Sequence, residues 1–487
     1  MQPQLKLLDD ALVERIISEG FDLLQDPGVK VYSDQGLTLL ADAGVDVDFG
    51  LRVARIPQSL VEKALETAPS EFALYDGDGS IAVRYGGDHV QFDPGSSAVN
   101  ILDGETGEHR QPITADYVRY AQLIEMLPAY DAISTAFVCS DVVEQVGDLY
   151  RLYLTLLYSK KPVVTGAFRV DTLHLMKDLL VADAGCMDRL AAKPRAVFDV
   201  CPSPPLVWSE LTCQNLIDLA GYRIPAEVVS MPLAGSTAPV TLVGAVVQHT
   251  AECMSGVAVH QLAGPGAPIV WGGAPAITDM RFGSTPMGAI ETSMIDAACA
   301  QVGKRLNMPT HAYLCASDSK LVDAQAGFES GMSALMGAMA GVNMISGAGM
   351  LDFLRAQSLE KLVIDAEIIA MVRRLLRGIR AHEPDLGSTL IRKVGHHGEF
   401  LSQKHTRTWF AQEQHIPSGV VDRGSLSGWR DAGSKTTLDR AHDQVRSLLA
   451  AYQPRSLPGE VRRTLYDIME RAARQFGMEH LPPLPAG

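Results

Sequence analysis

The chain has 487 residues, of which 47% are apolar, and carries 42 basic against 57 acidic side chains, a formal net charge of −15. This apolar content supplies material for a large core and argues against an intrinsically disordered protein. The acidic balance argues against a surface that binds nucleic acid or anionic membranes, because both need clustered lysine and arginine.

The N-terminal region carries amphipathic helix patterns separated by turns, such as DDALVERIISEGFDLLQD and PQSLVEKALETAP. Acidic residues stand where a secretory signal would need its apolar stretch. The most apolar segment of the chain, PVTLVGAVVQHTAECMSGVAVHQLAG, is interrupted by Gln248, His249, Glu252 and His260 and falls short of a continuous transmembrane span. We therefore expect residues 1–85 to be an N-terminal helical extension of a soluble, cytoplasmic protein.

From residue 89 onward, short runs rich in β-formers alternate with segments of helical length. The runs are HVQFDPG, AISTAFVCSD, PVVTGAF, RAVFDVCPSP, EVVSMPLAGS, PIVWGGAP, HAYLCASDS and NMISGAGM. The helix candidates lie near residues 115–127, 142–159, 170–183, 208–221, 240–262, 287–306, 324–341 and 359–380. This alternation predicts parallel strands with right-handed crossovers, and eight such units close naturally into a (β/α)8 barrel. A doubly wound open sheet is the competing interpretation.

These units set the expected domain boundaries. Residues 86–385 are predicted to form the (β/α)8 TIM barrel of an α/β protein, and residues 386–487, which are more polar, to cap or extend it. The C-terminal region contains KVGHHGEFLSQKHTRTWF, with three histidines that include His405; solvated surface histidines are the plainer interpretation. Glycine, alanine and methionine recur over 324–341, a composition suited to core packing or to close contact between subunits of a homo-oligomer.

Most predicted strands end in Gly, Ser, Pro, Asp or Cys, as HAYLC does where it runs into ASDSK. In a barrel these ends share one rim, where active sites lie, although helix-capping residues would account for about half of them. Aromatic residues make up only 6% of the chain, yet several fall at these ends, and converging aromatic rings bind quaternary ammonium groups. Core packing of the rings and capping by the aspartates are the alternatives. The binding candidates are Phe92, Asp93, Phe168, Trp271, Tyr313, Asp318, Phe353 and His405.

Motifs of several other chemistries are absent from the sequence. There is no GxxxxGK[ST], no HExxH and no GxSxG, and GGAPAITDMRFG lacks the GxGxxG spacing of a dinucleotide site. The seven cysteines form no CxxC pair, which fits a reducing compartment. Cys139, Cys201 and Cys315 lie near strand ends and could hold zinc, but free cysteine is commonly a small buried side chain, so no metal is expected. The catalytic residues are left unassigned.

Several of these segments resemble one known family. FDPGSSAVNILD, CPSPPL, MPLAGSTAPVTLVGAVVQHTAE, ASDSKLVDAQAGFES, NMISGAGML and GEFLSQKHT with VVDR are similar to the corrinoid-dependent trimethylamine methyltransferase superfamily, over roughly residues 10–480. The resemblance implies a barrel enzyme that moves a methyl group from a methylated amine to the Co(I) of a separate corrinoid protein. The trimethylamine enzymes carry pyrrolysine. This chain has only standard residues, and so resembles the branch that demethylates quaternary amines such as glycine betaine, proline betaine and carnitine.

The same resemblance implies that the chain binds no cofactor directly and that a partner protein supplies the corrinoid. A quaternary ammonium already carries its positive charge, so its methyl group can be displaced without a general acid. The protein then needs only to align the reactants and exclude water. Two other functions stay open on the residues alone: a cofactor-free barrel lyase or decarboxylase, and a non-catalytic betaine-binding or scaffold protein.

Overall fold

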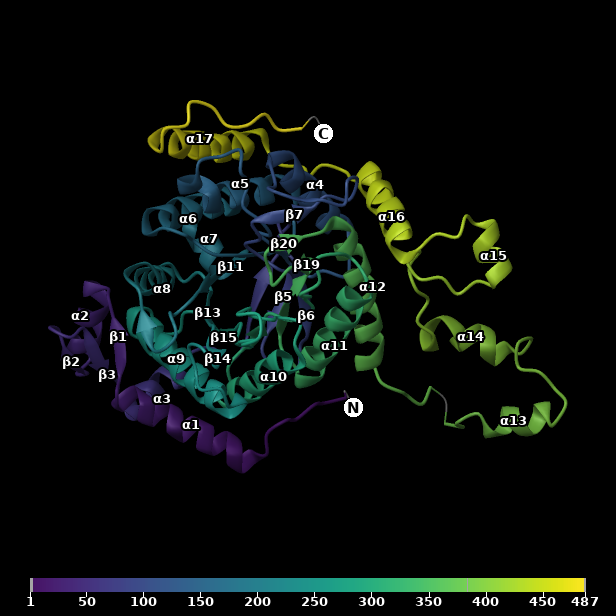
Figure 1. Ribbon diagram of the computed structural model, residues 1–487, viewed down its shortest axis with the longest axis horizontal. Helices are drawn as coiled ribbons and strands as arrows, with labels where there is room; N and C mark the ends of the chain where they lie inside the picture. Colours follow the sequence, from purple (N-terminus) through teal and green to yellow (C-terminus); the bar gives the residue numbers. More distant parts are fainter. Residues whose placement is uncertain (1–2, 383, 486–487) are drawn as a thin grey trace.

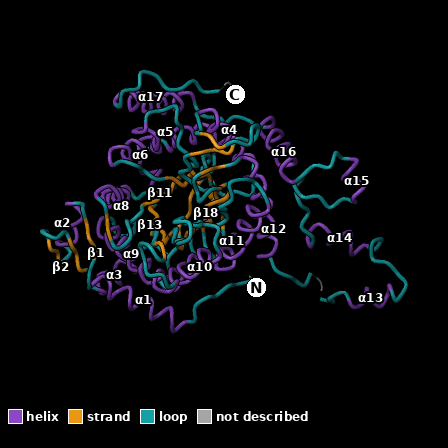
Figure 2. Tube along the Cα trace, viewed as in Figure 1, coloured by secondary structure: helices purple, strands orange, loops and turns teal. Residues whose placement is uncertain are grey.

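The computed structural model describes residues 3–382 and 384–485, as a mixed α/β fold with strands inside and helices outside (Figures 1 and 2). Eight strands of this described part form the centre. They are β6 (Gln91–Pro94), β9 (Ile133–Ser134), β10 (Val163–Thr165), β11 (Ala196–Val200), β13 (Ala226–Ser230), β15 (Ile269–Gly273), β17 (His311–Ala312) and β18 (Met344–Ala348). Each of the eight predicted runs is confirmed as a strand.

The central strands pair in two parallel ladders, as the alternation predicted. One ladder has the order β15-β13-β11-β10-β9, and the other has the order β17-β18-β6. Single parallel bridges connect the ladders at both edges, between Trp271 and Thr310 and between Ala98 and Phe137. The Trp271 N–H also donates to Pro309 O at 2.8 Å. The outer strands of each ladder therefore touch the other ladder through their backbones.

A helix follows each central strand. These helices are α4 (Thr114–Met126), α5 (Gly147–Tyr158), α6 (Val170–Ala184), α8 (Glu210–Tyr222), α9 (Leu242–Ala263), α10 (Ile290–Arg305), α11 (Ala324–Ala340) and α12 (Leu359–Leu376). All eight predicted helices are confirmed to within a few residues; a 3-10 turn, η1 (Glu144–Val146), precedes α5, and α7 (Met187–Ala192) follows α6. Local signals set the bounds: α11 starts where Asp323 caps the Ala326 N–H and ends at Gly341, which has φ 74°.

Helix α9 contains the apolar segment that the sequence marks as most membrane-like. It is the one helix of the described residues that is long and apolar enough to cross a membrane, but 78% of its most apolar window is buried inside the fold. The N-terminal helices α1 (Asp10–Gln25) and α3 (Gln58–Thr67) pack on it. Its Glu252 accepts a hydrogen bond from Ser230 at 2.6 Å. Helix α9 is thus packed as a core helix.

The first 85 residues contain strands as well as the expected helices. Helix α2 (Asp34–Asp42) lies beside a small sheet of β1 (Val29–Val31), β2 (Asp46–Asp48), β3 (Val53–Arg55) and β12 (Val207–Trp208). Strands β4 (Phe72–Tyr75) and β5 (Ile81–Tyr85) form a hairpin. The hairpin buries apolar side chains against the first residues of the central strands, namely Leu74, Val83 and Tyr85 against Val164, Val197, Val270 and Met344. These strands are too short for a clear alternation pattern.

Short strands also follow the central strands at their C-terminal ends. They are β7 (Asn100–Leu102), β8 (His109–Arg110), β19 (Met350–Leu351) and β20 (Ala356–Gln357) in one sheet, and β14 (Leu233–Ala234) and β16 (Ala276–Ile277) in another. They belong to the loops that connect strands to helices. The hairpin and these small sheets therefore lie at opposite ends of the central strands. The longer loops surround the C-terminal ends of the strands.

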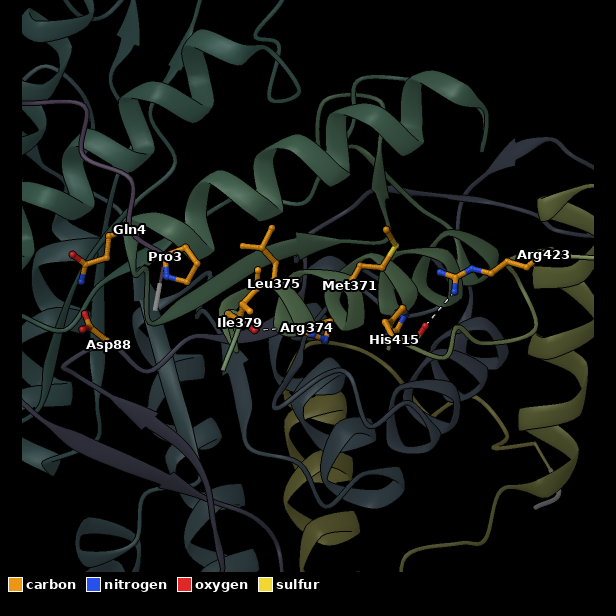
Figure 3. A pocket seen from close by; sticks show the side chains of 10 residues that line it. Pro3, Gln4, Asp88, Met371, Arg374, Leu375, Ile379, His415 and Arg423 are labelled. Carbon is orange, nitrogen blue, oxygen red and sulfur yellow. Dashed lines mark hydrogen bonds between the residues drawn. The ribbon is translucent and has the colours of Figure 1, made fainter. Parts of the chain in front are cut away.

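The C-terminal region first leaves the body and then returns to it. Helices α13 (Ser388–Val394), α14 (Lys404–Glu413) and α15 (Leu426–Asp431) lie away from the strands and contain no buried residue (Figure 1). Helix α16 (Thr437–Ala451) packs on α12 and α4, and α17 (Gly459–Gln475) packs on α5 and α6. A groove of about 1200 Å³ lies where the chain leaves α12 (Figure 3).

Candidate functional site

Four central strands place ionisable side chains in one buried layer. The residues are Asp93 on β6, Asp199 on β11, Glu227 on β13 and His311 on β17. His311 Nδ1 lies 2.6 Å from Glu227 Oε1, and both side chains are fully buried. The hydroxyl of Tyr85, from the hairpin, donates to Glu227 Oε2 at 3.4 Å. Residues far apart in the chain thus meet in the interior between the two ladders, below the C-terminal strand ends.

A glycine on the strand between β13 and β17 makes room for this layer. A Cβ on Gly272 of β15 would lie 2.9 Å from Glu227 Cγ and 3.1 Å from His311 Nδ1. Both contacts are closer than real Cβ atoms normally make, so a larger residue would displace the pair. Gly272 therefore allows a carboxyl and an imidazole from second-neighbour strands to touch.

Burial keeps the acidic side chains of this layer close to neutrality. It raises the pKa of Glu227 to about 8, and burial together with the charge of Glu227 raises the pKa of Asp199 to about 7. The pKa of Asp93 is also raised by burial. Burial lowers the pKa of His311 to about 4, so its imidazole is neutral at pH 7. The layer therefore exchanges protons around neutral pH and gains negative charge as the pH rises.

Tyr313 lies above this layer, one residue beyond β17. Its hydroxyl donates to Asp199 Oδ2 at 2.9 Å and lies 2.8 Å from Ser96 Oγ, which follows β6. The buried ring belongs to a small apolar cluster that includes Val229, Ala274 and Met287. The tyrosine therefore joins the ends of strands on different sides of the interior and presents an aromatic ring beside a carboxyl group.

Three carboxyl oxygens of this layer are buried without a hydrogen-bond partner among the residues that the structure describes: Asp93 Oδ2, Asp199 Oδ1 and Glu227 Oε1, of which the last lies close to His311 Nδ1. The other oxygen of each group is paired: Asp93 Oδ1 with the Ser346 hydroxyl, Asp199 Oδ2 with Tyr313 and Glu227 Oε2 with Tyr85. A buried oxygen without a partner costs free energy unless a ligand or water compensates it. This arrangement favours a cationic ligand.

The segment ASDSK after β17 is held by contacts within the protein. The Asp318 carboxylate accepts hydrogen bonds from the Met287 N–H at 2.8 Å and the Gly288 N–H at 3.0 Å. Burial raises the pKa of Asp318 to about 6. The Lys320 ammonium lies 3.9 Å from the centre of the Phe353 ring. Asp318 therefore fastens the loop before α10, and Phe353 already faces a cation of the protein.

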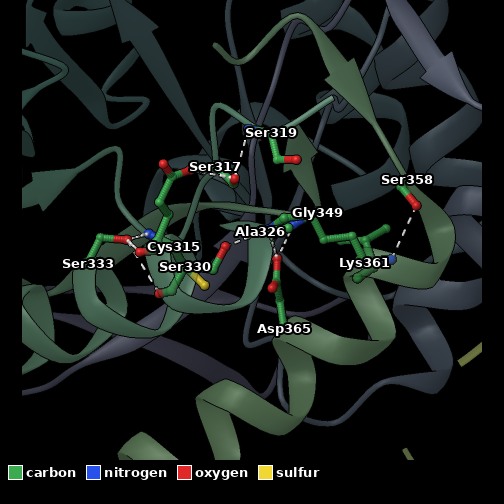
Figure 4. A network of polar contacts seen from close by, with 12 residues as sticks. Cys315, Ser317, Ser319, Ala326, Ser330, Ser333, Gly349, Ser358, Lys361 and Asp365 are labelled. Atoms are coloured by element: carbon green, nitrogen blue, oxygen red, sulfur yellow. Dashed lines mark hydrogen bonds and ion pairs between the residues drawn. The ribbon is translucent and has the colours of Figure 1, made fainter. Parts of the chain in front are cut away.

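A buried ion pair fixes the end of β18 behind this segment (Figure 4). Lys361 Nζ lies 2.5 Å from Asp365 Oδ2 on α12, and it donates to Ser330 Oγ on α11 at 2.6 Å. The same Asp365 oxygen accepts from the Gly349 N–H at 2.7 Å. These contacts tie two helices to the strand end and leave the lysine no freedom to reach a ligand.

Strained backbone conformations gather at the same strand ends. Ser97, after β6, has φ 63°, and Cys315, after β17, has φ 68°. Asp352, Phe353 and Leu354 are consecutive residues beyond β18, with φ of 50°, 58° and 64°. A left-handed non-glycine residue costs about 1–2 kcal/mol, and such residues persist where the surroundings fix them, often at functional sites.

The structure brings only some of the predicted binding residues together. Asp93 and Tyr313 share the interior, whereas Phe92 points to the helices, where the Arg373 guanidinium lies 5.8 Å from its ring centre. Trp271 also faces the helices, with its ring 5.9 Å from that of His249 on α9. The expected single box of rings is therefore wrong for these two aromatics, because successive side chains of a strand point to opposite faces.

Two further candidates lie outside the interior. Phe168 is partly exposed beyond β10, and the guanidinium of Arg151 lies 4.6 Å from its ring centre. His405 is exposed on α14, in the part of the chain that lies away from the strands (Figure 1). Neither side chain is brought to Tyr313 by the fold.

The sequence reasoning missed three members of the buried layer, Asp199, Glu227 and His311. Each carried a signal, because it is an ionisable residue within or beginning an apolar strand run, as in RAVFDV, AEVVS and HAYLC. Such residues are seldom buried without a specific reason. Only the parallel register, however, shows that they face one another rather than the helices.

The structure shows no arrangement suited to a bound metal in the described residues. No group of three or more His, Cys, Asp and Glu side chains there is placed to hold an ion. Burial raises the pKa of the thiols of Cys139, Cys201 and Cys315, which disfavours the thiolate form that zinc would need.

Comparison with known proteins gives a consistent result. A sequence profile described as trimethylamine methyltransferase (MTTB) matches residues 1–477. The chain is 31% identical to the trimethylamine methyltransferase MttB of Methanosarcina barkeri, over 93% of this chain and 92% of that protein. It is 29% identical to the glycine betaine methyltransferase of Desulfitobacterium hafniense, over 98% and 99%.

A solved structure supports the fold. The monomethylamine methyltransferase MtmB of Methanosarcina barkeri matches 98% of this chain and 89% of its own, with a TM-score of 0.52 and 13% sequence identity. At that identity the likeness concerns the mixed α/β architecture alone. The profile match over nearly the whole length and the 31% identity decide the relationship. The chain belongs to the trimethylamine methyltransferase (MTTB) family.

Proposed function

We propose that this protein transfers a methyl group from a quaternary amine, glycine betaine or a related betaine, to the Co(I) of a separate corrinoid protein. The observation that carries the proposal is the pair of unpartnered carboxylate oxygens of Asp93 and Asp199 beside the Tyr313 ring. Carboxyl groups next to an aromatic ring suit a cation that has no hydrogen to donate, and a bound cation would favour their ionised form. The full-length relative that is named a glycine betaine methyltransferase supports the substrate class, as does a sequence of standard residues without pyrrolysine.

The reaction needs no proton transfer. The bond between nitrogen and the methyl carbon breaks, its electron pair stays on nitrogen, and a neutral tertiary amine leaves. The reduced corrinoid of the partner supplies the electron pair for the new bond to the methyl carbon. The tasks left to this chain are to hold the ammonium beside Tyr313, to align one methyl group with the opening at the strand ends, and to exclude water.

We also propose that the two ladders act as one closed (β/α)8 barrel over residues 86–385. The bridges at both edges and the contact between Glu227 and His311 across β15 support closure. Residues 1–85 would then be the N-terminal extension that covers the far end of the barrel, and residues 386–487 the C-terminal extension. In this arrangement Tyr313 stands at the mouth, where barrel enzymes place their substrates.

The loops around this mouth support a protein partner. Apolar side chains stand exposed in the segments after β13 and β15, namely Met231, Val240, Met280 and Phe282. Exposed apolar side chains gathered on one surface commonly mark a site of protein association. The corrinoid protein would dock there and present its cobalt to the substrate. We expect this cytoplasmic enzyme to bind no corrinoid itself.

The test is methyl transfer by the purified protein. Glycine betaine, choline and trimethylamine are each incubated with the protein and chemically reduced free cobalamin, and the spectral change of the cobalamin and the demethylated amine are followed. Dimethylglycine formed in step with methylcobalamin, from glycine betaine only, is the expected result. Binding of glycine betaine without transfer would instead identify a binding protein, and release of carbon dioxide a decarboxylase.

A further inference from the structure

Arg151 of α5 carries a buried positive charge that has no ion-pair partner among the described residues. Its Nη1 donates to Thr135 O at 2.8 Å and lies 3.3 Å from Ser97 Oγ, while one face of the guanidinium covers Phe168. No carboxylate of the described residues forms an ion pair with it, and its Nε and Nη2 have no hydrogen-bond partner there. The nearby Asp148 acts on Arg151 only through space, because its carboxylate accepts hydrogen bonds from the Phe168 N–H and the Thr172 hydroxyl instead.

The unpartnered atoms form the edge of the guanidinium that binds carboxylates. Nε and Nη2 point the same way and can donate to the two oxygens of one carboxylate. The chain shows this geometry at its surface, where Arg169 Nε and Nη2 donate to the two oxygens of Asp171 at 2.9 and 3.0 Å. Because buried polar groups are normally hydrogen-bonded, the two unpaired donors of Arg151 indicate a site for a carboxylate.

Arg151 also lies at the same end of the strands as the candidate site. Its partners Thr135 and Ser97 follow β9 and β6, and Phe168 follows β10. Its charge is near enough to lower the pKa of Asp199, against the larger effect of burial. A basic group thus stands close to the acidic layer, and a betaine carries a cation and a carboxylate on one short chain.

We propose that Arg151 binds the carboxylate of the substrate through Nε and Nη2, so that the protein selects quaternary amines that bear a carboxylate. This inference rests on the proposed function, because it assumes that the ammonium group lies beside Tyr313. It adds Arg151 as the residue that binds the carboxylate end of the substrate. Choline, which has a hydroxyl instead, would leave the guanidinium unpaired and bind more weakly.

The experiment compares glycine betaine with choline by titration calorimetry, in the wild type and in Arg151→Met. We expect the wild type to prefer glycine betaine, and the variant to lose about 10- to 100-fold in affinity for glycine betaine while choline changes less than about threefold. Equal losses for the two ligands, or none, would overturn the role of Arg151. A wild type that binds neither ligand would overturn the proposed function itself.

Two more variants keep the test decisive. Arg151→Lys retains the charge without the two-donor edge, so it should lose part of the preference even if Arg151→Met does not fold. Arg195→Met removes another buried arginine, which is ion-paired with Asp183 on the outside of the strands. It should lower stability and leave the preference for glycine betaine unchanged. A shift of preference in Arg195→Met as large as that in Arg151→Met would contradict the proposal.

A second, independent observation concerns residues 379–412, which we term the arm. It contains α13 and nearly all of α14, and its apolar side chains stand in solvent: Ile379 is 97%, Leu386 83% and Leu401 78% exposed. The described residues of the arm, 379–382 and 384–412, extend away from the body (Figure 1). Its sequence has five Lys and Arg against three Asp and Glu, which leaves a net charge of −17 on the rest of the chain.

The groove at the base of the arm is the matching surface. The exposed side chains of Met371 and Leu375 on α12 line it, with Pro3 and Asp88 on the other side (Figure 3). Ile379, the first residue of the arm, lines the groove as well. The groove therefore begins where the arm leaves, but this chain's own arm turns away from it.

We infer that the arm of a second copy lies in this groove, and that two copies exchange arms about a two-fold axis. The groove and the arm meet at Ile379. A two-fold axis that passes beside this residue would therefore place the arm of each copy against α12 of the other. The groove lining includes Arg374 and Arg423 against a single carboxylate, Asp88, so the contact rests on the apolar side chains of arm and groove rather than on charge. In a two-fold dimer each copy contributes the same surfaces, so each chain would both donate an arm and accept the arm of the other copy in its groove.

Light scattering after size exclusion tests the exchange on the full-length protein. We expect a wild-type dimer, and monomers both for Leu386→Asp with Leu401→Asp in the arm and for Met371→Asp in the groove. Leu51→Asp, an exposed apolar position in the N-terminal region, is the control and should stay dimeric. A monomeric wild type, or dimers in both the arm and the groove variants, would overturn the inference. Dimeric arm variants that only lose methyl transfer would point to the corrinoid protein as the occupant instead.

Discussion

Tyr313 and Asp199 meet across the interior of the fold, with 2.9 Å between the phenolic oxygen and Oδ2. Asp199 is on β11 and Tyr313 follows β17, and β13 and β15 lie between these two strands. The Ser96 hydroxyl, 2.8 Å away, completes the hydrogen bonding of the phenol. The ring is therefore fixed beside a carboxyl group before any ligand arrives. A quaternary ammonium bound here, as we propose, would gain from the ring face and from an ionised carboxylate, and it needs no hydrogen-bond acceptor.

Replacing Tyr313 should weaken betaine binding in a way that depends on the ring. Tyr313→Ala loses a cation–π contact worth up to about 2 kcal/mol, so the dissociation constant for glycine betaine should rise about thirtyfold. Tyr313→Phe keeps the ring and should bind within about fivefold of the wild type. Titration calorimetry measures both. Equal affinity of all three proteins, with only the melting temperature lowered in Tyr313→Ala, would show that the ring merely packs.

Asp318 should behave differently from Tyr313, because its carboxylate is engaged by two backbone N–H groups. Asp318→Ala removes both hydrogen bonds of a charged acceptor and should lower the free energy of unfolding by about 2–4 kcal/mol. The affinity of the folded variant for glycine betaine should stay within about threefold of the wild type. Urea unfolding and calorimetry give the two numbers. A large loss of affinity at unchanged stability would instead place Asp318 at the bound cation.

The sequence predicted the strands and helices of the central fold because their patterns are local. The helix 324–341 has its cap at Asp323 and its glycine stop at Gly341, both visible in the sequence. The β4–β5 hairpin was not foreseen, since strands of four and five residues give too few positions for a period. Their place at the far end of the central strands depends on contacts with residues more than fifty positions away.

Residue type alone did not tell which of the predicted binding residues face the interior. Asp93 and Tyr313 point inward, whereas Phe92, beside Asp93 on β6, and Trp271 on β15 face the helices. Composition marks a strand end as polar or aromatic, but the register decides which side chains meet. Arg151 lay outside the strand-end argument, because it reaches the end of β9 from helix α5.

The ion pair of Lys361 and Asp365 should contribute strongly to stability. Lys361→Met leaves a buried carboxylate without its cation, which typically costs about 3–5 kcal/mol. Adding Asp365→Asn removes the stranded charge and still offers an oxygen to the Gly349 N–H, so the double variant should recover part of that loss. Urea denaturation of the two variants and the wild type measures this. A single variant within about 1 kcal/mol of the wild type would contradict the expectation.

Stability should depend on pH through the acidic layer. The pKa of Asp199 is about 7 in the folded chain and near 3.8 when unfolded, so the folded state binds the proton more tightly. The proton on Asp199 therefore stabilises the folded state. This stabilisation is complete below about pH 4 and is lost as the pH rises through 7. Asp199→Asn stays neutral, so its melting temperature relative to the wild type should increase between pH 4 and 8. A constant difference over this range would contradict the shifted pKa.

Binding of a cation should run in the opposite direction with pH. Asp199 and Glu227, with pKa values of about 7 and 8, are largely protonated at pH 6 and ionised at pH 9. A quaternary ammonium is attracted to the ionised carboxylates, so affinity for glycine betaine should rise with pH, by up to about tenfold per unit for each proton released. The betaine keeps its charges over this range, so the slope reports on the protein alone. Asp199→Asn removes one titrating group and should flatten the profile below pH 8. Titration calorimetry in buffers of different ionisation enthalpy counts the released protons directly, and a wild-type affinity that is constant from pH 6 to 9 with no proton release would rule out the acidic layer as the cation site.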